Sequence, residues 1–166
     1  MKAFTLWTSA AAIGFFGGLA VQAQTLAQPA HQGHGPDHRL YTPDTIRWTA
    51  APPSFRRGAE AALLFGDPSR EGPFVLRLRF PDGYVIAPHR HPGAEILTVL
   101  SGTFALGVGE DASRGEVIRM TAGSFTAMPA GMPHHARAEG ETVVQLNSMG
   151  PWSITYINPA DDPRRQ

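Results

Sequence analysis

The sequence predicts an all-β fold built from short antiparallel strands. Its 166 residues include 18 glycines and 15 prolines, which recur too often through the central region for a long helix to fit there. Residues 74–80 alternate apolar and other side chains, as a strand with one buried face does. Pro81, Asp82 and Gly83 follow directly and predict a turn, because proline presets the first corner and glycine accepts a positive φ.

The strands expected in chain order are separated by Gly, Pro, Asp or Ser at nearly every junction. Ser101 and Gly102 are expected to end one strand before the next begins. No internal repeat with a period of about 20–50 residues is visible, which indicates one barrel rather than two. The expected strands are residues 61–65, 74–80, 84–89, 96–100, 103–108, 116–120, 124–128, 134–138, 142–147 and 152–158.

Residues 1–23 are predicted to be a secretory signal peptide. Lys2 supplies a positive start, residues 3–19 are mostly apolar, and Val21 and Ala23 are the small residues before a cut after Ala23. An uncleaved membrane anchor is the alternative, but the interrupting glycines and the cleavage site favour export. We therefore expect a periplasmic or secreted protein without membrane association after cleavage. The absence of cysteine argues against a lipoprotein anchor and a disulfide framework.

Residues 24–40 are predicted to form a flexible tail that contains His31, His34 and His38. A solvated linker and a segment that recruits metal ions both fit this composition. Residues 41–160 are predicted to form a single barrel domain that includes an N-terminal arm. Trp48, in that arm, is interpreted as a packing residue rather than as a platform for a substrate ring.

Charge and composition restrict the expected partners. Fourteen basic and 14 acidic side chains give a formal net charge of +0, and basic residues do not cluster with aromatic ones, so nucleic acid is not expected as a partner. Charged residues make up only 17% of the chain, and Lys2 is its only lysine. A largely uncharged surface is compatible with a homodimer. The expected partner is a small-molecule ligand or substrate.

Four side chains are candidate metal ligands. His89 and His91 are two residues apart, so both point to the same side of an extended strand, and Pro88 disfavours a helix there. Glu95 follows a Pro-Gly break, and His134 comes much later in the chain. Three imidazoles with one carboxylate suit a divalent transition metal, namely iron, manganese, copper, nickel or zinc, rather than calcium.

Two blocks around these candidates resemble the two motifs of the cupin superfamily. They read GYVIAPHRHPGAEILTVLSG and GSFTAMPAGMPHHARA, and the resemblance extends over residues 74–148. The positions that carry it are Gly83-x5-His89-x-His91-x3-Glu95-x6-Gly102 and Gly123-x5-Pro129-x-Gly131-x2-His134.

The resemblance implies a small antiparallel jelly-roll barrel with a metal held inside by His89, His91, Glu95 and His134. The assignment of His134 rather than its neighbour His135 rests on the family spacing. The second motif of the family usually has an asparagine where this chain has Ala138. That departure leaves the four expected ligands in place.

The function implied by the resemblance is that of a metal-dependent oxidoreductase of dioxygenase type. The expected substrate is a small organic molecule such as an enediol, a catechol or a flavonol, and Glu95 is expected to be both a ligand and the proton acceptor. One alternative is a non-catalytic cupin that binds or senses a metal or a ligand. Another is a metal-assisted lyase, isomerase or decarboxylase, for which zinc would suffice. Whether the protein is an enzyme is open at this point.

Strand alternation also predicts what surrounds the site. Arg77 and Arg79 share one face of the strand at residues 74–80. Exposure to solvent is the simpler interpretation, and the alternative is that they face the barrel and hold an anionic substrate. The side chains expected to face the interior and form an apolar pocket are Leu97, Val99, Phe104, Leu106 and Met128.

Overall fold

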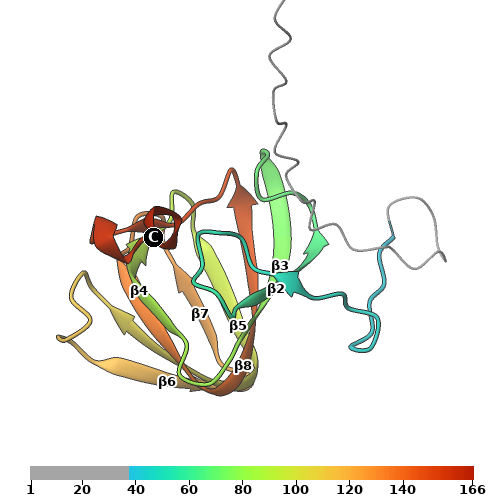
Figure 1. The fold of residues 1–166 in the computed structure, drawn as a ribbon. Helices are drawn as coiled ribbons and strands as arrows, with labels where there is room; N and C mark the ends of the chain where they lie inside the picture. Colours follow the sequence, from blue (N-terminus) through green and yellow to red (C-terminus); the bar gives the residue numbers. More distant parts are fainter. Residues whose placement is uncertain (1–37) are drawn as a thin grey trace, which may run out of the picture.

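The computed structural model describes residues 38–166, which form a β-barrel with two short 3-10 helices near the C-terminus (Figure 1). The predicted signal peptide and the tail as far as residue 37 lie outside the described residues. Within residues 38–166, none of the helices has the length and apolar character needed to span a bilayer. The predicted all-β fold is confirmed for the described part of the chain.

The elements follow one another with short connections. In chain order they are β1 (Thr49–Ala50), β2 (Glu60–Phe65), β3 (Gly72–Phe80), β4 (Val85–Arg90), β5 (Glu95–Val108), β6 (Val117–Thr121), β7 (Phe125–Met128), β8 (His134–Gly150), β9 (Thr155–Tyr156), η1 (Pro159–Asp161) and η2 (Pro163–Arg165).

Two long strands, β5 and β8, run through both walls of the barrel. The first half of β5 pairs with β7 and with the second half of β8, which in turn pairs with β3. The second half of β5 pairs with β6 and with the first half of β8, which pairs with β4. All of these pairs are antiparallel, so the walls form the jelly-roll type of barrel that the motifs imply (Figure 1).

The prediction that Ser101 and Gly102 end a strand is wrong. Strand β5 continues through them, and its register with β8 shifts on both sides of Ser101. Gly102 has φ of 73°, and a Cβ there would lie 2.8 Å from the Cα of Thr142. Glycine is therefore needed at this position for a corner inside the strand, where the chain bends from one wall into the other.

The same corner joins two other expected strands into one. Residues 134–138 and 142–147 both belong to β8, and Gly140 between them has φ of 72°. The Thr142 hydroxyl is fully buried there and donates to the carbonyl oxygen of Thr103 at 3.1 Å. Elsewhere, β9 is shorter than the expected strand at residues 152–158, and β1 was not expected.

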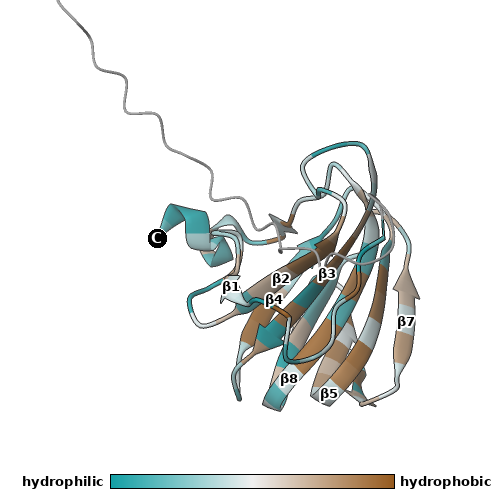
Figure 2. Cartoon of the chain, turned by 90° about the vertical axis from the view of Figure 1, so that its right-hand side faces the viewer, coloured by the Kyte–Doolittle hydropathy of each residue, from teal (hydrophilic) through white to brown (hydrophobic). Residues whose placement is uncertain are grey.

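The core fills the barrel with apolar side chains. Hydrophobic residues, brown in Figure 2, recur along the strands that supply them. Phe80 lies at the centre of the core, with its ring centroid 5.1 Å from that of Tyr84 and 6.0 Å from that of Phe104. Leu76 and Leu78 face inward as the alternation of β3 predicts. The same alternation directs Arg77 and Arg79 away from the core.

Arg77 and Arg79 contact the outside of the barrel and do not form an anion site within it. Arg79 Nε donates to Glu60 at 2.7 Å, and its guanidinium lies 4.6 Å from the centre of the Trp48 ring. Trp48 packs on an outer cluster of Ile46, Ala62 and Leu64. The arm therefore covers the outer face of β2, and Trp48 has the packing role interpreted from the sequence.

Candidate metal centre

The four predicted ligands come from three strands that meet at one end of the barrel. His89 lies in β4 and His91 directly after it, Glu95 begins β5, and His134 begins β8. His89 and His134 are register partners across β4 and β8. All four residues are buried, with 3–6% of their surface exposed.

A bulge in β4 orients His89 toward the interior. The register of β4 against β8 shifts between Ile86 and His89, and both of these residues are buried although they are three apart. Pro88 lies inside the bulge. Proline has no N–H to donate, and at a bulge the strand ladder does not require one. Regular alternation resumes after it, so His91 faces the same interior as His89.

The three imidazoles converge on one point. One nitrogen from each of His89, His91 and His134 lies within 4.8 Å of the other two. The ring centroids of His89 are 4.2 Å from His134 and 4.8 Å from His91. One Glu95 carboxylate oxygen is 3.3 Å from His91 Nε2 and 3.1 Å from His134 Nε2. The structure therefore brings all four predicted residues together.

Backbone carbonyls fix the orientation of each imidazole. The Nδ1 atoms of His89, His91 and His134 lie 2.7, 2.8 and 3.0 Å from the carbonyl oxygens of Ala87, Ser153 and Met132. Because a carbonyl oxygen only accepts, each Nδ1 carries the donated proton, and Nε2 is the ring nitrogen that remains for the centre of the cluster. Histidine ligands of metals are commonly held by a hydrogen bond of this kind.

Two polar atoms inside this cluster lack a hydrogen bond to any described residue. His91 Nε2 and Glu95 Oε2 are buried and have no hydrogen-bond partner in the described part of the chain, since their short contact does not meet hydrogen-bond geometry. Buried polar atoms without partners cost free energy and are uncommon in native proteins. The three histidines could bind a metal ion, and an ion at their centre would satisfy these atoms.

Burial and mutual proximity shift the pKa values of the cluster. Burial, together with the charges of His134 and His91, lowers the pKa of His89 to about 3. Burial alone would raise the pKa of Glu95, but the contacts with His134 and His91 outweigh it and hold this pKa below its usual range. Burial likewise opposes the effect of Glu95 on His134, whose pKa is raised on balance. Without a metal, Glu95 is thus ionised and His89 is neutral.

Little free space remains beside the cluster. The cavity that the four residues line has a volume of about 20 Å³, close to that of one water molecule. Leu97, Phe104 and Met128 line it as expected. Val99 and Leu106 are also buried, but they pack in the core and do not line the cavity.

Three aromatic or aliphatic side chains close the cavity from segments that the sequence did not assign to the site. They are Phe55 from the arm, and Trp152 and Ile154 from the connection between β8 and β9. The Trp152 ring stacks on His91, with centroids 4.5 Å apart and an interplanar angle of 17°. These residues lie in irregular segments, where neither periodicity nor a motif indicates the direction of a side chain.

His135 faces away from the cluster, as expected for the neighbour of an inward-facing strand residue. Its ring packs directly over Gly107, where any Cβ would collide with it. Its Nε2 is buried and has no hydrogen-bond partner in the part of the chain that the structure describes. Of the two adjacent histidines, His134 is therefore the one that contacts Glu95. Of the three tail histidines, only His38 belongs to the described residues.

Comparisons with known proteins agree with this architecture. Residues 76–149 match the family model of the cupin domain. No protein of curated function matches the sequence. Among solved structures, the polyketide cyclase RemF from Streptomyces resistomycificus is similar, with a TM-score of 0.63 and 14% identity over 77% of this chain and 91% of that one.

Two further structures have the same fold. KdgF from Halomonas sp. has a TM-score of 0.52 and 21% identity over 66% of this chain and 91% of that one. A salicylate 1,2-dioxygenase variant from Pseudoaminobacter salicylatoxidans, in complex with gentisate, has a TM-score of 0.50 and 18% identity over 61% of this chain and 30% of that one. At these identities the likeness extends to the fold and not to the reaction.

Proposed function

The chain carries a cupin domain, and on this basis we propose that it is an exported metal-binding protein that acts as a metal-dependent oxidoreductase of dioxygenase type. His89, His91, Glu95 and His134 are the proposed ligands. The proposed ion is iron, manganese, copper, nickel or zinc, and the proposed substrate is a small organic molecule.

One observation carries this proposal. Three buried imidazoles converge on a common point, next to a Glu95 oxygen that has no hydrogen-bond partner among the described residues. A purely structural histidine would be satisfied by a neighbouring donor or acceptor. A nitrogen-rich set with one carboxylate suits first-row transition metals.

The residues around the site have distinct proposed roles. A redox-active ion would supply chemistry toward dioxygen, whereas zinc would supply Lewis-acid chemistry. The carbonyl oxygens of Ala87, Ser153 and Met132 hold the imidazoles in place. Glu95 is proposed both as a ligand and as the group that accepts a substrate proton within hydrogen-bond reach. The apolar wall excludes bulk water.

A second candidate is a non-catalytic metal-binding or ligand-sensing cupin. The observation in its favour is the closed cavity of about 20 Å³, which has no room for an organic substrate. A metal-assisted lyase, isomerase or decarboxylase is a third candidate, because the same ligands can hold a redox-inert ion. The likeness to a polyketide cyclase and to a dioxygenase is one of fold and favours neither of these enzyme classes.

Oxygen consumption separates these candidates. The full-length protein is loaded with each metal in turn, its metal content is measured, and oxygen uptake is followed with catechol and with a flavonol. We expect uptake with at least one redox-active metal and none with zinc. If fully metallated protein takes up no oxygen with any of these substrates, the oxidoreductase proposal is wrong. Thermal stabilisation by a ligand without turnover would then favour the binding protein.

Export is a separate part of the proposal and rests on the sequence of residues 1–23. The test is expression of the full chain in a bacterium with a periplasm, followed by N-terminal sequencing of the periplasmic protein. We expect Gln24 as the new N-terminus, because the cut is predicted after Ala23. A full-length protein in the cytoplasmic fraction would contradict export.

A further inference from the structure

An organic molecule can reach the histidine cluster only if a side chain moves. The cavity of about 20 Å³ accommodates a water-sized group beside the four polar residues and no carbon skeleton. Phe55, Trp152 and Ile154 close it, and each belongs to an irregular segment. Access to the cluster therefore depends on the least restrained of these three side chains.

Two of the three, Phe55 and Ile154, are buried side chains in segments that hydrogen bonds fix, whereas Trp152 is only partly buried. Phe55 is flanked by carbonyl groups that accept hydrogen bonds from buried tyrosines, because Tyr156 donates to Ser54 and Tyr84 donates to Arg56, each at 2.7 Å. Ile154 is 2% exposed, and its carbonyl oxygen accepts a hydrogen bond from Arg164 at 3.0 Å.

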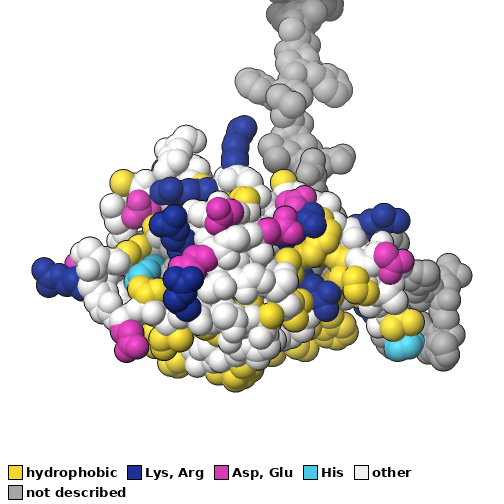
Figure 3. All heavy atoms as spheres, turned by 90° about the horizontal axis from the view of Figure 1, so that it is seen from below, with side chains coloured by type: hydrophobic (Ala, Val, Ile, Leu, Met, Phe, Trp, Pro, Cys, Tyr) yellow, Lys and Arg dark blue, Asp and Glu magenta, His cyan; other side chains and the backbone are white. Residues whose placement is uncertain are grey.

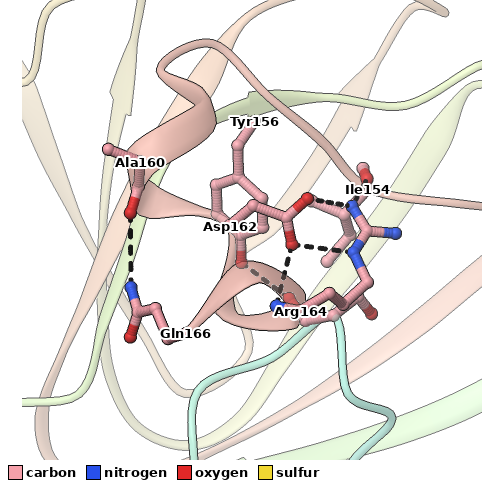
Figure 4. Close-up of polar contacts among 7 residues, drawn as sticks. Ile154, Tyr156, Ala160, Asp162, Arg164 and Gln166 are labelled. Atoms are coloured by element: carbon pink, nitrogen blue, oxygen red, sulfur yellow. Dashed lines mark hydrogen bonds and ion pairs between the residues drawn. The ribbon is translucent and has the colours of Figure 1, made fainter.

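The C-terminal segment reinforces this hold on Ile154. Arg164 is itself fixed by the carboxylate of Asp162, whose two oxygens accept hydrogen bonds at 2.7 and 2.8 Å (Figure 4). Gln166 donates to the carbonyl oxygen of Ala160 across the same turn. Movement of Ile154 would therefore disrupt a connected set of contacts.

Trp152 stacks on His91 and is only partly buried, and within the described residues it forms hydrogen bonds through its backbone alone. Its N–H donates to the carbonyl oxygen of Pro68 at 2.8 Å, whereas the indole Nε1 is buried and has no partner among the described residues. A buried N–H without an acceptor disfavours the position that the indole now occupies. Rotation of the Trp152 side chain would break no hydrogen bond.

Trp152 also separates the inner cavity from a second space. A hollow of about 240 Å³ lies against it, lined mainly by apolar groups that include Pro52, Pro68 and Leu76. Trp152 and Ile154 are the two residues that line both spaces. An indole that rotates into the hollow would open the cluster to it and would bring Nε1 toward water.

The slot that the indole would vacate has the shape of a flat ring. One wall is the His91 ring, which is nearly parallel to the indole at 4.5 Å, and another is Phe74, which meets it edge-on at 6.0 Å. Such walls favour a planar aromatic group over a saturated one. The slot offers no charged side chain other than the proposed ligands.

We propose that Trp152 controls access to the site and determines substrate specificity: its indole gives way to the ring of a planar aromatic molecule, so that such molecules are selected among the chelating substrates expected above. This inference rests on the metal-binding function proposed above and adds a specificity-determining residue to it. Access is then governed by the rotation of one side chain.

Two probes with the same chelating group test the proposal by binding alone. Benzohydroxamate carries a phenyl ring and acetohydroxamate carries a methyl group. Their dissociation constants are measured calorimetrically on full-length protein loaded with Zn²⁺, which is redox-inert. We expect Trp152→Ala to shift the affinity ratio toward benzohydroxamate by about fivefold to tenfold, the range that corresponds to one aromatic pair. Trp152→Phe should give a smaller shift, and Trp48→Phe, outside the barrel, should give none.

Fluorescence supplies a second readout that leaves Trp152 in place. The chain contains three tryptophans, so Trp152 is the only one left in a Trp7→Phe, Trp48→Phe variant. Saturation with benzohydroxamate should move its emission to longer wavelength, because the indole becomes more exposed to water.

The possible failures can be told apart. Absence of bound Zn²⁺ in the wild-type protein would overturn the proposed metal function, and this inference with it. Bound Zn²⁺ with an affinity ratio unchanged within about twofold in Trp152→Ala would overturn the role of Trp152 alone. Should that variant not fold, an unchanged emission spectrum in the Trp152-only protein would overturn it instead.

Discussion

Two regions inside the same barrel differ in whether their buried polar atoms have hydrogen-bond partners. Around Phe80, Phe104 and Val144 the interior is apolar, and the buried Thr142 hydroxyl among them donates to a backbone carbonyl. At the other region, four ionisable side chains face one another, and His91 Nε2 and Glu95 Oε2 have no hydrogen-bond partner within residues 38–166.

The contrast shows which region stabilises the fold and which one is kept for binding. Burial of apolar surface stabilises the protein by about 25 cal/mol per Å², whereas buried polar atoms without partners cost free energy. The cluster of His89, His91, Glu95 and His134 thus destabilises the metal-free fold. Variants in the two regions should therefore have opposite consequences.

The largest effect on stability is expected in the apolar region. Phe80→Ala removes a ring that is 1% exposed and stacks on Tyr84 and Phe104. We expect the free energy of unfolding to fall by about 3–5 kcal/mol, measured by chemical denaturation. Metal affinity of the fraction that remains folded should fall far less than in a ligand variant, since Phe80 contributes only carbon atoms to the wall of the cavity. A parallel loss of metal affinity would mean that the two regions are not independent.

The next effect concerns the polar region. His91→Ala removes one converging nitrogen, and we expect metal affinity to fall by more than about 100-fold, since loss of even an indirect contact to a metal ligand costs about 10- to 100-fold. Stability of the metal-free protein should change far less than in Phe80→Ala, because an unsatisfied polar atom is removed together with its packing. Full metal occupancy in this variant would count against the proposed ligands.

Acidification should destabilise the metal-free protein through His89. Its pKa of about 3 in the folded state lies below the ordinary value of 6.5, so between these values the unfolded chain binds more protons and stability rises with pH. From about pH 6.5 to about pH 5 we expect a loss of about 1–2 kcal/mol. The raised pKa of His134 changes stability mainly above this pH range. The lowered pKa of Glu95 changes it mainly below this range.

His89→Gln is the matched control for this pH dependence. It keeps a polar side chain and removes the titration, so the loss between about pH 6.5 and about pH 5 should become small. The measurement is a series of denaturant titrations on metal-free protein. An equal slope in the wild type and in His89→Gln would show that another group is responsible.

The smallest effect on stability is expected outside the barrel, where apolar side chains remain exposed. Phe125 is 63% and Ile96 39% exposed on the outer face of β7 and β5. Charged groups of both signs are interspersed with apolar ones over the face in Figure 3, and Arg119 pairs with Glu139. The homodimer expected from the composition is tested at the exposed side chain of Phe125.

Phe125→Asp should change the unfolding free energy by no more than about 0.5 kcal/mol, as is usual for exposed positions. It should nevertheless shift the protein toward a monomer in analytical ultracentrifugation. A wild-type protein that is monomeric at all concentrations would contradict the expected dimer.

The motifs and the alternation of side chains predicted most of the site and the type of fold. His89, His91, Glu95 and His134 meet because strands with a period of two direct them to one interior. The corners were missed, because Gly102 at positive φ is typical of a turn as well as of a bulge inside a strand. Only the register between β5 and β8 distinguishes the two, and register depends on residues far apart in the chain.

The closure of the site could not be predicted for a related reason. Phe55 and Trp152 lie in irregular segments, whose side-chain directions are set by tertiary contacts. Tyr84 and Tyr156 determine the place of Phe55 through hydrogen bonds to its neighbours, across long separations in sequence. An aromatic residue in such a segment is indistinguishable in sequence from an ordinary packing residue.

The most direct test of the account is the metal content of the full-length wild-type protein beside that of His134→Ala and His135→Ala. The two variants each remove one of two adjacent imidazoles, of which only His134 faces Glu95. We expect about one transition metal ion per chain in the wild type and in His135→Ala, and almost none in His134→Ala. Equal metal content in all three proteins, or none in the wild type after loading, would contradict a metal centre at this site.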